Sequence, residues 1–366
     1  MQPLRVAMTL EQLWHRVPGG TAIATLGMAR ALAAQGDVAV VGVGAAHVGA
    51  PPEPFVSPVQ VKSLPLPRPA LYWAWHSLRR PKVQLATGDV DVIHATTLAI
   101  PPRSALLVVT IHDLAFLDRP ADFTARGMRL FTRGLELALQ DAVVVLVPSE
   151  ATRRDCIAAG FEDARLRVVP WGVDAAVVDV AHIGSTLRRY GISGRYVLWT
   201  GTREPRKNLS ALLDAFERVD TDARLVLAGP EGWGTDELSK RRDPRVVGLG
   251  FVPPNDLVAL YAGAAAFCYP SLKEGFGLPV LEAMAQATPT ITSRGTSTEE
   301  IGGDAVLLVD PHDPSSIADA IQQVLDDEGL AGQLRAAGSQ RAATFTWKRT
   351  AELVSTAYRE AARMHE

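Results

Sequence analysis

The stretch SLKEGFGLPVLEAMAQ, residues 271–286, combines a glycine turn, the start of a helix and two glutamates. The short apolar run before it, residues 264–270, ends in a proline and is typical of a buried parallel strand. Gly275 and Gly277 permit the tight or positive-φ backbone of a turn, and Pro279 suits the first turn of a helix. Because the free amides at a helix start attract phosphate, the sequence predicts an anion site where this strand ends.

The two glutamates of this stretch lie on either side of the turn. Glu282 follows it by about one helical turn, so we do not expect it to form a close carboxylate pair with Glu274, as in a glycosidase. We expect the two side chains to hold different parts of one ligand. A plain strand-to-helix connection with a solvated glutamate is the alternative, and the acid-Gly-aromatic-Gly pattern favours the ligand site.

Two glutamates separated by seven residues around a Gly-Phe-Gly turn resemble the signature of the family-4 retaining glycosyltransferases of GT-B architecture. The resemblance implies that Glu274 bonds hydroxyls of the donor sugar and that Glu282 bonds the ribose hydroxyls of the nucleotide. It also implies that the amides of Phe276, Gly277 and Leu278 approach the diphosphate and the sugar.

Length and composition exclude several classes of protein. The 366 residues favour two domains, and a net charge of −3 gives no electrostatic case for binding nucleic acid. Cys156 and Cys268 are far apart and lack a Cys-x-x-Cys companion, which favours a reduced, cytoplasmic protein. The N-terminus is unlike a signal peptide, and no apolar run reaches the roughly 18 residues of a membrane span. We therefore expect a cytoplasmic protein, at most peripheral at the inner face of the membrane.

Strand and helix patterns alternate in both halves of the chain. This alternation predicts an α/β protein with two doubly wound, Rossmann-like domains and ligands at the carboxyl edges of the strands. We assign residues 1–175 to an acceptor-side domain and residues 176–345 to a nucleotide-sugar-binding domain. The resemblance implies that residues 346–366 form a helix crossing back to the first domain, and we expect the site in the cleft between the domains.

The first half begins with an expected buried strand at residues 4–9, a Pro-Gly-Gly turn and a helix at residues 21–35. Ile23 belongs to the expected apolar face of this helix. The resemblance implies that Gly19 and Gly20 lie close to the donor phosphates. A simple helix start is the alternative.

His112 and Asp113 come directly after the expected strand at residues 106–110. Open α/β sheets place their ligands at this end of a strand. The resemblance implies that His112 contacts the donor sugar, and we assign Asp113 to the acceptor side.

Cations gather at a second strand-to-helix turn, GTREPRKN at residues 201–208. Cationic side chains at a helix start add to the attraction that the helix amides already exert on an anion. The string resembles the diphosphate clamp of the family, with Lys207 as the first cation and either Arg206 or Arg203 as the second. The loop at residues 248–253, which contains Phe251, resembles the segment that borders the nucleobase.

Several motifs are set aside. GVGAAH at residues 42–47 approaches the dinucleotide fingerprint, but it ends in His47 and prolines follow where a helix is required, which argues against a nicotinamide oxidoreductase. Asp89 with Asp91, and Asp220 with Asp222, are interpreted as solvated segments rather than metal sites. Residues 51–69 are expected to form an extended surface connection.

Aromatic residues adjoin three cations in LYWAWHSLRRPK, residues 71–82. We favour a helix that packs its aromatic rings inward and leaves a solvated basic end. The other interpretation is a patch for an acceptor or a membrane surface, since aromatic rings and arginines settle at the lipid interface.

The expected enzyme moves a hexose from a nucleoside-diphosphate sugar to a hydroxyl of a glycan or lipid-linked acceptor, with retention. The sequence resembles bacterial mannosyltransferases and related hexosyltransferases of polysaccharide assembly, so GDP-mannose is the first candidate donor. The resemblance implies no metal and no further cofactor. The alternatives are a nucleotide-sugar epimerase, a phosphorylase of the same fold and a non-catalytic sugar-nucleotide sensor.

Overall fold

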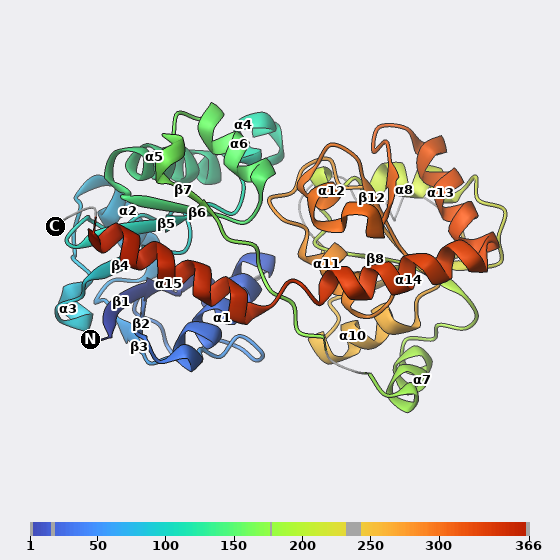
Figure 1. Ribbon diagram of the computed structural model, residues 1–366, viewed down its shortest axis with the longest axis horizontal. Helices are drawn as coiled ribbons and strands as arrows, with labels where there is room; N and C mark the ends of the chain where they lie inside the picture. The colour runs from blue at the N-terminus through green and yellow to red at the C-terminus, as the bar shows by residue number, and fades with distance from the viewer. Residues whose placement is uncertain (1–2, 16–18, 176–177, 232–242, 364–366) are drawn as a thin grey trace. The chain divides into compact units, whose positions relative to one another are not determined.

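The computed structural model describes residues 3–15, 19–175, 178–231 and 243–363 (Figure 1). The chain divides into two compact units. The first comprises Met1–Gly172 and Thr346–Glu366, and the second comprises Val173–Phe345. Each unit is an α/β structure with its own parallel sheet, so the predicted fold class is confirmed.

The described residues of the first unit form a seven-stranded sheet in the order β3-β2-β1-β4-β5-β6-β7. Every neighbouring pair is parallel, and a parallel sheet covered on both faces has continuously apolar strands such as LLVVT in β5. The strands are β1 (Leu4–Thr9), β2 (Val38–Gly44), β3 (Val61–Ser63), β4 (Val92–Ala95), β5 (Leu106–Thr110), β6 (Val144–Val147) and β7 (Leu166–Val168). The helices are α1 (Gly19–Gln35), α2 (Arg68–Ser77), α3 (Gln84–Thr87), α4 (Ala115–Asp118), α5 (Ala125–Asp141), α6 (Glu150–Ala158) and α15 (Trp347–Arg363).

The second unit has a six-stranded parallel sheet over its described residues, in the order β10-β9-β8-β11-β12-β13. Its strands are β8 (Tyr196–Thr200), β9 (Arg224–Ala228), β10 (Val246–Gly250), β11 (Ala266–Tyr269), β12 (Thr290–Ser293) and β13 (Leu307–Val309). Its helices are α7 (Val180–Arg189), α8 (Leu209–Phe216), α10 (Pro254–Gly263), α11 (Leu278–Ala285), α12 (Ser297–Gly302), α13 (Pro314–Asp326) and α14 (Glu328–Ala342). Strands β8 and β11 are neighbours, with Leu198 opposite Phe267, and this places the segments that follow them at one edge.

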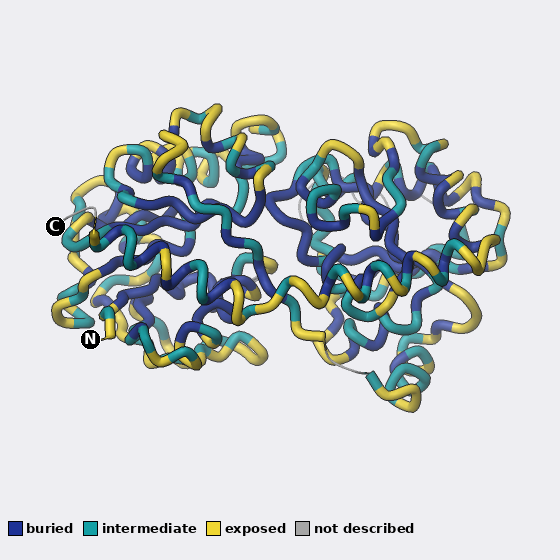
Figure 2. The backbone as a smooth tube through the Cα atoms, viewed as in Figure 1, coloured by how far each residue is buried: buried dark blue, intermediate teal, exposed yellow. Residues whose placement is uncertain are grey.

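Burial is concentrated in the strands of both units (Figure 2). Cys156 and Cys268 are free and buried, and burial raises the pKa of both thiols, that of Cys156 to about 12. Such thiols are unreactive at neutral pH. Among the described helices, none has the length and apolar character needed to cross a bilayer.

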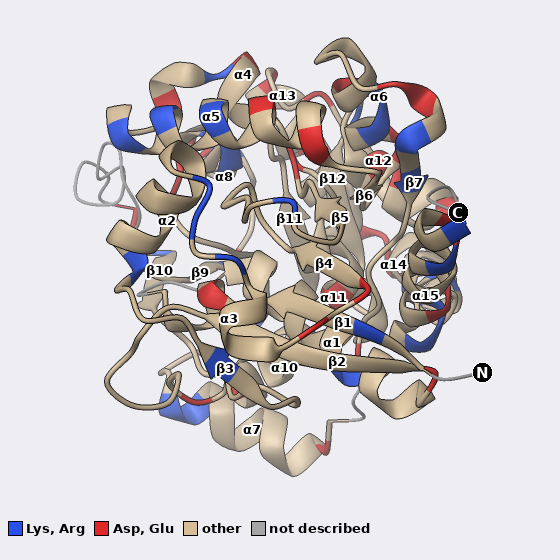
Figure 3. Cartoon of the chain, turned by 90° about the vertical axis from the view of Figure 1, so that its left-hand side faces the viewer, with Lys and Arg blue, Asp and Glu red and all other residues tan. Residues whose placement is uncertain are grey.

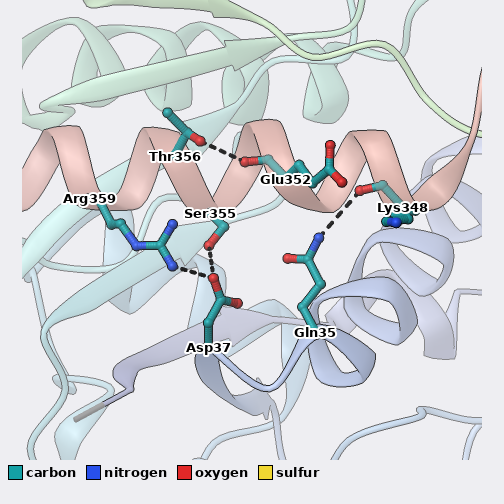
Figure 4. A pocket seen from close by; sticks show the side chains of 7 residues that line it. All are labelled: Gln35, Asp37, Lys348, Glu352, Ser355, Thr356 and Arg359. Carbon is teal, nitrogen blue, oxygen red and sulfur yellow. Dashed lines mark hydrogen bonds and ion pairs between the residues drawn. The ribbon is translucent and has the colours of Figure 1, made fainter. Parts of the chain in front are cut away.

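The final helix, α15, packs in the first unit beside α1 and against β5 and β6 (Figure 1). Figure 4 shows a pocket along this contact, where Asp37 accepts hydrogen bonds from Ser355 Oγ at 3.0 Å and from Arg359. Deeper in the unit, Tyr358 OH lies 2.7 Å from His94 Nδ1. Burial lowers the pKa of His94 to about 3, so this contact involves a neutral imidazole. Polar contacts therefore hold α15 in two places, at Asp37 in the pocket and at His94 in the buried core.

Three expected elements differ from the structure. The segment at residues 51–69 contains β3, which pairs with β2, and α2 already begins at Arg68. Strand β3 has only three residues, too few for a period to show. Helix α7, for which no element was expected, begins at Val180 soon after the expected domain boundary, and Asp179 caps it. Helix α1 begins at Gly19, so Gly19 and Gly20 form its first residues rather than a turn before it.

One residue of the expected apolar face of α1 was misplaced. Ile23 was expected in the core, but 42% of it is exposed. The buried residues are instead mostly small, among them Ala22, Ala24 and Ala29, because α1 packs closely against α15. At Gly27, an added Cβ would lie 2.4 Å from ring atoms of Trp347.

We predict opposite effects for two helical Gly-to-Ala changes. Gly27→Ala overpacks the α1–α15 contact and should lower the free energy of unfolding by about 1–3 kcal/mol. Gly332→Ala, in α14, meets no atom within 4 Å and should raise it by about 0.4–1 kcal/mol. Thermal and urea unfolding followed by circular dichroism measure both. Equal shifts of the same sign would contradict the packing described for α15.

Candidate functional site

The site is built where β8 and β11 end. The chain after β8 forms a short 3-10 turn, Pro205–Lys207, and the chain after β11 passes beside it. The backbone N–H of Leu272 donates to the carbonyl of Arg206 at 2.8 Å, and Ser271 Oγ donates to the same carbonyl at 2.9 Å. The two predicted motifs, one cationic and one acidic, are thus joined through their backbones.

An ion cluster fills the junction between the two motifs. Lys207 Nζ lies 2.6 Å from Glu274 Oε1, and Arg206 Nη1 lies 3.0 Å from Glu274 Oε2. Arg206 Nε also contacts Glu204 Oε2 at 2.9 Å. Glu274 and Lys207 are 8% exposed, so the cluster is largely withdrawn from water. Two cations and two carboxylates leave it electrically balanced.

Hydroxyl groups complete the shell of Glu274. Tyr269 OH donates to Glu274 Oε1 at 2.9 Å and Ser271 Oγ donates to the same oxygen at 2.8 Å. Lys207 Nζ contacts the Tyr269 hydroxyl and lies 5.0 Å from the centroid of its ring. Burial alone would raise the pKa of Glu274, but the charges of Lys207 and Arg206 outweigh it and lower that pKa to about 2.

The ionised state limits what Glu274 can do. With a pKa near 2 it remains a carboxylate at neutral pH, so it accepts hydrogen bonds and cannot serve as a general acid. The pKa of Lys207 is also lowered, by burial first and by Arg206 next, while Glu274 and Glu204 act in the opposite direction. The 2.6 Å contact with Glu274 supports the charged form of Lys207.

The turn after Glu274 has the geometry expected of a helix start. Gly277 caps α11 with φ 107°, and a Cβ there would lie 2.7 Å from Thr298 Cγ2, so both backbone and space require glycine. Ser297 Oγ donates to the carbonyl of Glu274 at 2.8 Å and supports the turn from α12. Phe276 and Leu278 are buried, so their side chains are largely inaccessible to a ligand.

Glu282 lies in a different environment on α11. Its Oε2 accepts a hydrogen bond from Tyr261 OH at 3.0 Å, and Tyr261 OH also lies 2.7 Å from Thr200 Oγ1. Burial raises the pKa of Glu282 to about 7, against the lowering effect of the Tyr261 bond. The two glutamates have separate sets of partners, in agreement with the expectation that they do not form a close pair.

Two further predicted residues of the second unit lie outside the ion cluster. Arg203 Nη1 is 3.9 Å from Glu231 Oε1, whereas Arg206 is joined to Lys207 through Glu274. This arrangement favours Arg206 as the second cation. Phe251 follows β10 and is 63% exposed, so its ring is accessible to a planar ligand.

The remaining predicted residues lie in the first unit. His112 Nε2 is 2.9 Å from the carbonyl of Thr96, and a carbonyl only accepts, so Nε2 carries the proton. Burial lowers the pKa of His112, although the Thr96 bond and Asp113 raise it, and a neutral ring leaves Nδ1 as an acceptor. Asp113 Oδ1 accepts from Ala115 N at 3.0 Å, a local cap. Gly19 has φ 63°, and both it and Gly20 are exposed.

Several residues of the site were not singled out from the sequence. They are Glu204, Tyr261, Tyr269 and Ser271. Tyr269 ends a buried strand and was assigned to the core, but its position at the carboxyl end of β11 was the available signal. Glu204 was part of the quoted cationic string, yet only the cations were assigned.

The set-aside acidic pairs have structural roles where they are described. The Asp91 carboxylate accepts the backbone N–H of Arg5 at 2.8 Å, whereas Asp220 contacts Gln322 through its backbone N–H, which donates to Oε1 at 2.9 Å. Within the described residues, no group of three or more His, Cys, Asp or Glu side chains is placed to hold a metal ion.

Comparisons with known proteins agree with this geometry. Residues 192–341 match the model for glycosyl transferases group 1, and residues 18–177 match the model for glycosyltransferase family 4. The O-antigen chain mannosyltransferase B of Escherichia coli is 33% identical over 80% of this chain and 81% of that protein. A D-inositol 3-phosphate glycosyltransferase of Acidothermus cellulolyticus is 31% identical over 75% of this chain and 65% of that protein.

Solved structures share the fold at low sequence identity. Anabaena HepE in complex with UDP and glucose gives a TM-score of 0.76 at 19% identity, covering 96% of this chain and 98% of that chain. Sucrose-phosphate synthase from Thermosynechococcus elongatus gives 0.76 at 22% identity, covering 98% of both. Together with the two family models and the 33% identical relative, these matches show that the chain is a glycosyltransferase and belongs to the group 1, family 4 glycosyltransferases of the GT-B fold.

Proposed function

We propose that this enzyme transfers a hexose, with mannose as the first candidate, from a nucleoside-diphosphate sugar to a hydroxyl of a glycan or lipid-linked acceptor. The transfer proceeds with retention and without a metal ion. The observation that carries the proposal is the buried junction of Lys207, Arg206 and Glu274 beside the start of α11. It combines fixed cations, the start of a helix and an ionised carboxylate, which are groups that suit a sugar diphosphate.

Departure of the nucleoside diphosphate creates negative charge at the phosphate. Lys207 and Arg206 are held by Glu274 and Glu204 before any ligand arrives, so little reorganisation is needed when that charge develops. The amide groups at the start of α11 add a positive potential of their own. In this proposal these three sources take the place of a metal ion.

Glu274 serves the sugar rather than the leaving group. Because its pKa is about 2, it presents a carboxylate that accepts donor-sugar hydroxyls and favours the positive charge of an oxocarbenium-like sugar. The acceptor hydroxyl attacks the face from which the phosphate departs, and its proton passes to that phosphate. We assign His112 to the donor sugar, Asp113 to the acceptor side, and Gly19 and Gly20 to the donor phosphates.

Mannose is proposed because relatives named mannosyltransferases match the chain, among them the 33% identical protein and the serotype-specific mannosyltransferase WbdA of Escherichia coli. GDP is the first candidate nucleotide. Glu282 is assigned to the ribose and Phe251 to the edge of the base. The side chain of Phe251 does not determine which base is bound.

The proposed function is tested by incubating the enzyme and GDP-mannose, in EDTA, with and without mannosyl acceptors, and by screening GDP, UDP, dTDP and ADP for thermal stabilisation. We expect a product with the anomeric configuration of the donor, and Lys207→Ala should lower kcat/KM by about 10²–10³-fold. Lys62→Ala removes an exposed lysine and is the matched control.

Outcomes of this assay separate the alternatives. A new sugar nucleotide formed from donor alone would indicate an epimerase, dependence on inorganic phosphate would indicate a phosphorylase, and binding without turnover would indicate a sensor. Near-normal transfer by Lys207→Ala would contradict the roles assigned to the ion cluster.

Nucleotide affinity is predicted to depend on the ionisation of Glu282. The folded-state pKa of Glu282 is raised to about 7, so the carboxylate that accepts ribose hydroxyls is formed only as pH rises through 7. GDP should therefore bind more tightly at pH 8 than at pH 6, and Glu282→Gln should lose this part of the pH dependence. Isothermal titration calorimetry measures both.

The phosphate of GDP titrates in the same range, so the informative quantity is the difference between the pH profiles of wild type and Glu282→Gln. Glu328→Gln, at an exposed glutamate of α14, is the control and should follow wild type. Identical pH profiles of GDP affinity for wild type and Glu282→Gln would contradict the assignment of Glu282 to the ribose.

We further propose that the first unit contacts an anionic membrane surface through α2 and its neighbours. Tyr72 and Trp75 point into the core, as favoured from the sequence, but Trp73 is 61% exposed and Leu78 is 58% exposed. Among the described residues, the exposed side chains of Arg80, Lys82 and Arg129 make no ion pair. Figure 3 shows Lys and Arg along α5 and near α2. Exposed aromatic and aliphatic groups beside unpaired cations complement an anionic lipid surface.

Vesicle sedimentation tests this contact with phosphatidylglycerol-containing and pure phosphatidylcholine vesicles. Only the anionic vesicles should bind the protein, and Arg80→Ala with Lys82→Ala should weaken binding by about fivefold per cation removed. Arg188→Ala with Lys348→Ala removes two exposed cations elsewhere and should have little effect. Equal losses in the two double variants, or no binding, would contradict the assignment.

A further inference from the structure

His47, the residue that breaks the dinucleotide pattern, belongs to a cluster at the carboxyl edge of the first unit's sheet. It follows β2, and Glu11 and Trp14 lie in the 3-10 turn that follows β1, the neighbouring strand. The carboxyl edge of an α/β sheet is where ligands bind. No function has so far been assigned to this cluster.

Glu11 is a buried carboxylate, 2% exposed, aimed at His47. Its Oε2 accepts the backbone N–H of Ala45 at 2.7 Å, and His47 Nε2 lies 2.9 Å from Oε2 and 2.8 Å from Oε1. Gly44 leaves room for this arrangement, because a Cβ there would lie 3.3 Å from Oε2. A carboxylate only accepts, so Nε2 carries a proton, and in the neutral form of the ring Nδ1 is an acceptor.

The orientation of the His47 ring is fixed by Trp14. The two rings stack with centroids 4.6 Å apart and planes 3° from parallel, and Trp14 Nε1 donates to the carbonyl of Gly49 at 3.2 Å. The His47 side chain is 19% exposed, and its Nδ1 makes no hydrogen bond with the described residues. Glu11 and Trp14 thus orient the imidazole of His47, and its Nδ1 is available to a ligand.

The groups around this pair suit a polyhydroxylated ligand. Arg68 Nη1 donates to the carbonyl of Trp14 at 3.5 Å, which brings a cation to the cluster. Burial and the charge of Glu11 raise the pKa of Tyr72, while burial, Arg68 and His47 lower the pKa of His15 to about 4. Amphipathic rings, an imidazole nitrogen and a guanidinium provide both apolar faces and hydrogen bonds for a sugar.

We propose that His47 is a binding residue for the acceptor sugar, accepting a hydrogen bond from one of its hydroxyls through Nδ1, with Glu11 as the positioning residue that sets the tautomer. Trp14 and Arg68 flank the bound ring. This inference rests on the proposed function, because it identifies where the acceptor of that reaction binds. It makes His47 a determinant of acceptor specificity.

The test follows the imidazole of His47 by NMR while methyl α-D-mannopyranoside, methyl α-D-glucopyranoside and methyl α-D-galactopyranoside are titrated, each with and without GDP. At least one sugar should shift the His47 signals saturably while leaving those of His312, an exposed histidine of the second unit, in place. His47→Phe preserves stacking on Trp14 but removes Nδ1, and it should raise the Kd of that sugar about tenfold or more.

A second variant tests the role of Glu11. Glu11→Gln can donate toward His47, so the ¹⁵N shifts of the imidazole should move toward the opposite tautomer, an effect that loss of packing alone does not produce. His312→Phe is the matched control for His47→Phe, and unfolding curves verify that each variant is folded.

The proposal is wrong if none of the three sugars shifts His47 under either condition, or if His47→Phe binds sugar as tightly as wild type. If the tautomer of His47 is unchanged in Glu11→Gln, the positioning role assigned to Glu11 is wrong. Failure of the proposed function gives a different result. Sugar binding at His47 without hexose transfer would support the binding site and contradict the proposed reaction. Hexose transfer with an unchanged acceptor KM in His47→Phe would support the reaction and contradict the binding site.

Discussion

The carboxylate of Glu274, buried between Lys207 and Arg206, is the constraint on which the second unit depends. Withdrawing one charge from water costs several kcal/mol, so Glu274 and Lys207 are tolerated only together and only with the hydroxyls of Tyr269 and Ser271 in place. That requirement fixes the turns after β8 and β11 against each other. A buried ion pair adds little net stability over apolar side chains of similar volume, whereas removing one partner leaves an uncompensated buried charge.

The two glutamates of the organising stretch show how one helix start provides two chemical environments. Glu274 has two cationic partners and remains ionised, whereas Glu282 has a tyrosine hydroxyl as its recorded partner and becomes neutral near physiological pH. Their separation along the chain was visible in the sequence, but this difference was not. It arises from Lys207 and Arg206, which are more than sixty residues away along the chain and reach only one of them.

Much of the fold could be predicted because apolar periodicity and glycine turns are local properties. Both sheets, the helix after Gly277 and the last three helices follow from such patterns. Ile23 could not be placed correctly, since the packing of α15 on small residues of α1 is a contact between distant segments. Strand β3 was too short to show a period, and it depends on pairing with β2.

The candidate site was only partly predictable for a similar reason. Motif spacing and family resemblance indicated Lys207, Arg206 and Glu274, which the structure brings within hydrogen-bond distance. The contributions of Glu204 and Tyr269 require knowing which side chains point toward the junction. His47 was recognised only as a mismatch to another motif, because its partner Glu11 follows a different strand.

The return of α15 to the first unit has a consequence for how the protein is made. A ribosome releases the residues of α15 only after the whole second unit, although their packing partner α1 emerges before that unit. During synthesis the glycine- and alanine-rich side of α1 therefore remains exposed until α15 has been made. The first unit is thus completed only after the second unit has been translated, and a chain interrupted before Trp347 leaves it without the helix that covers α1.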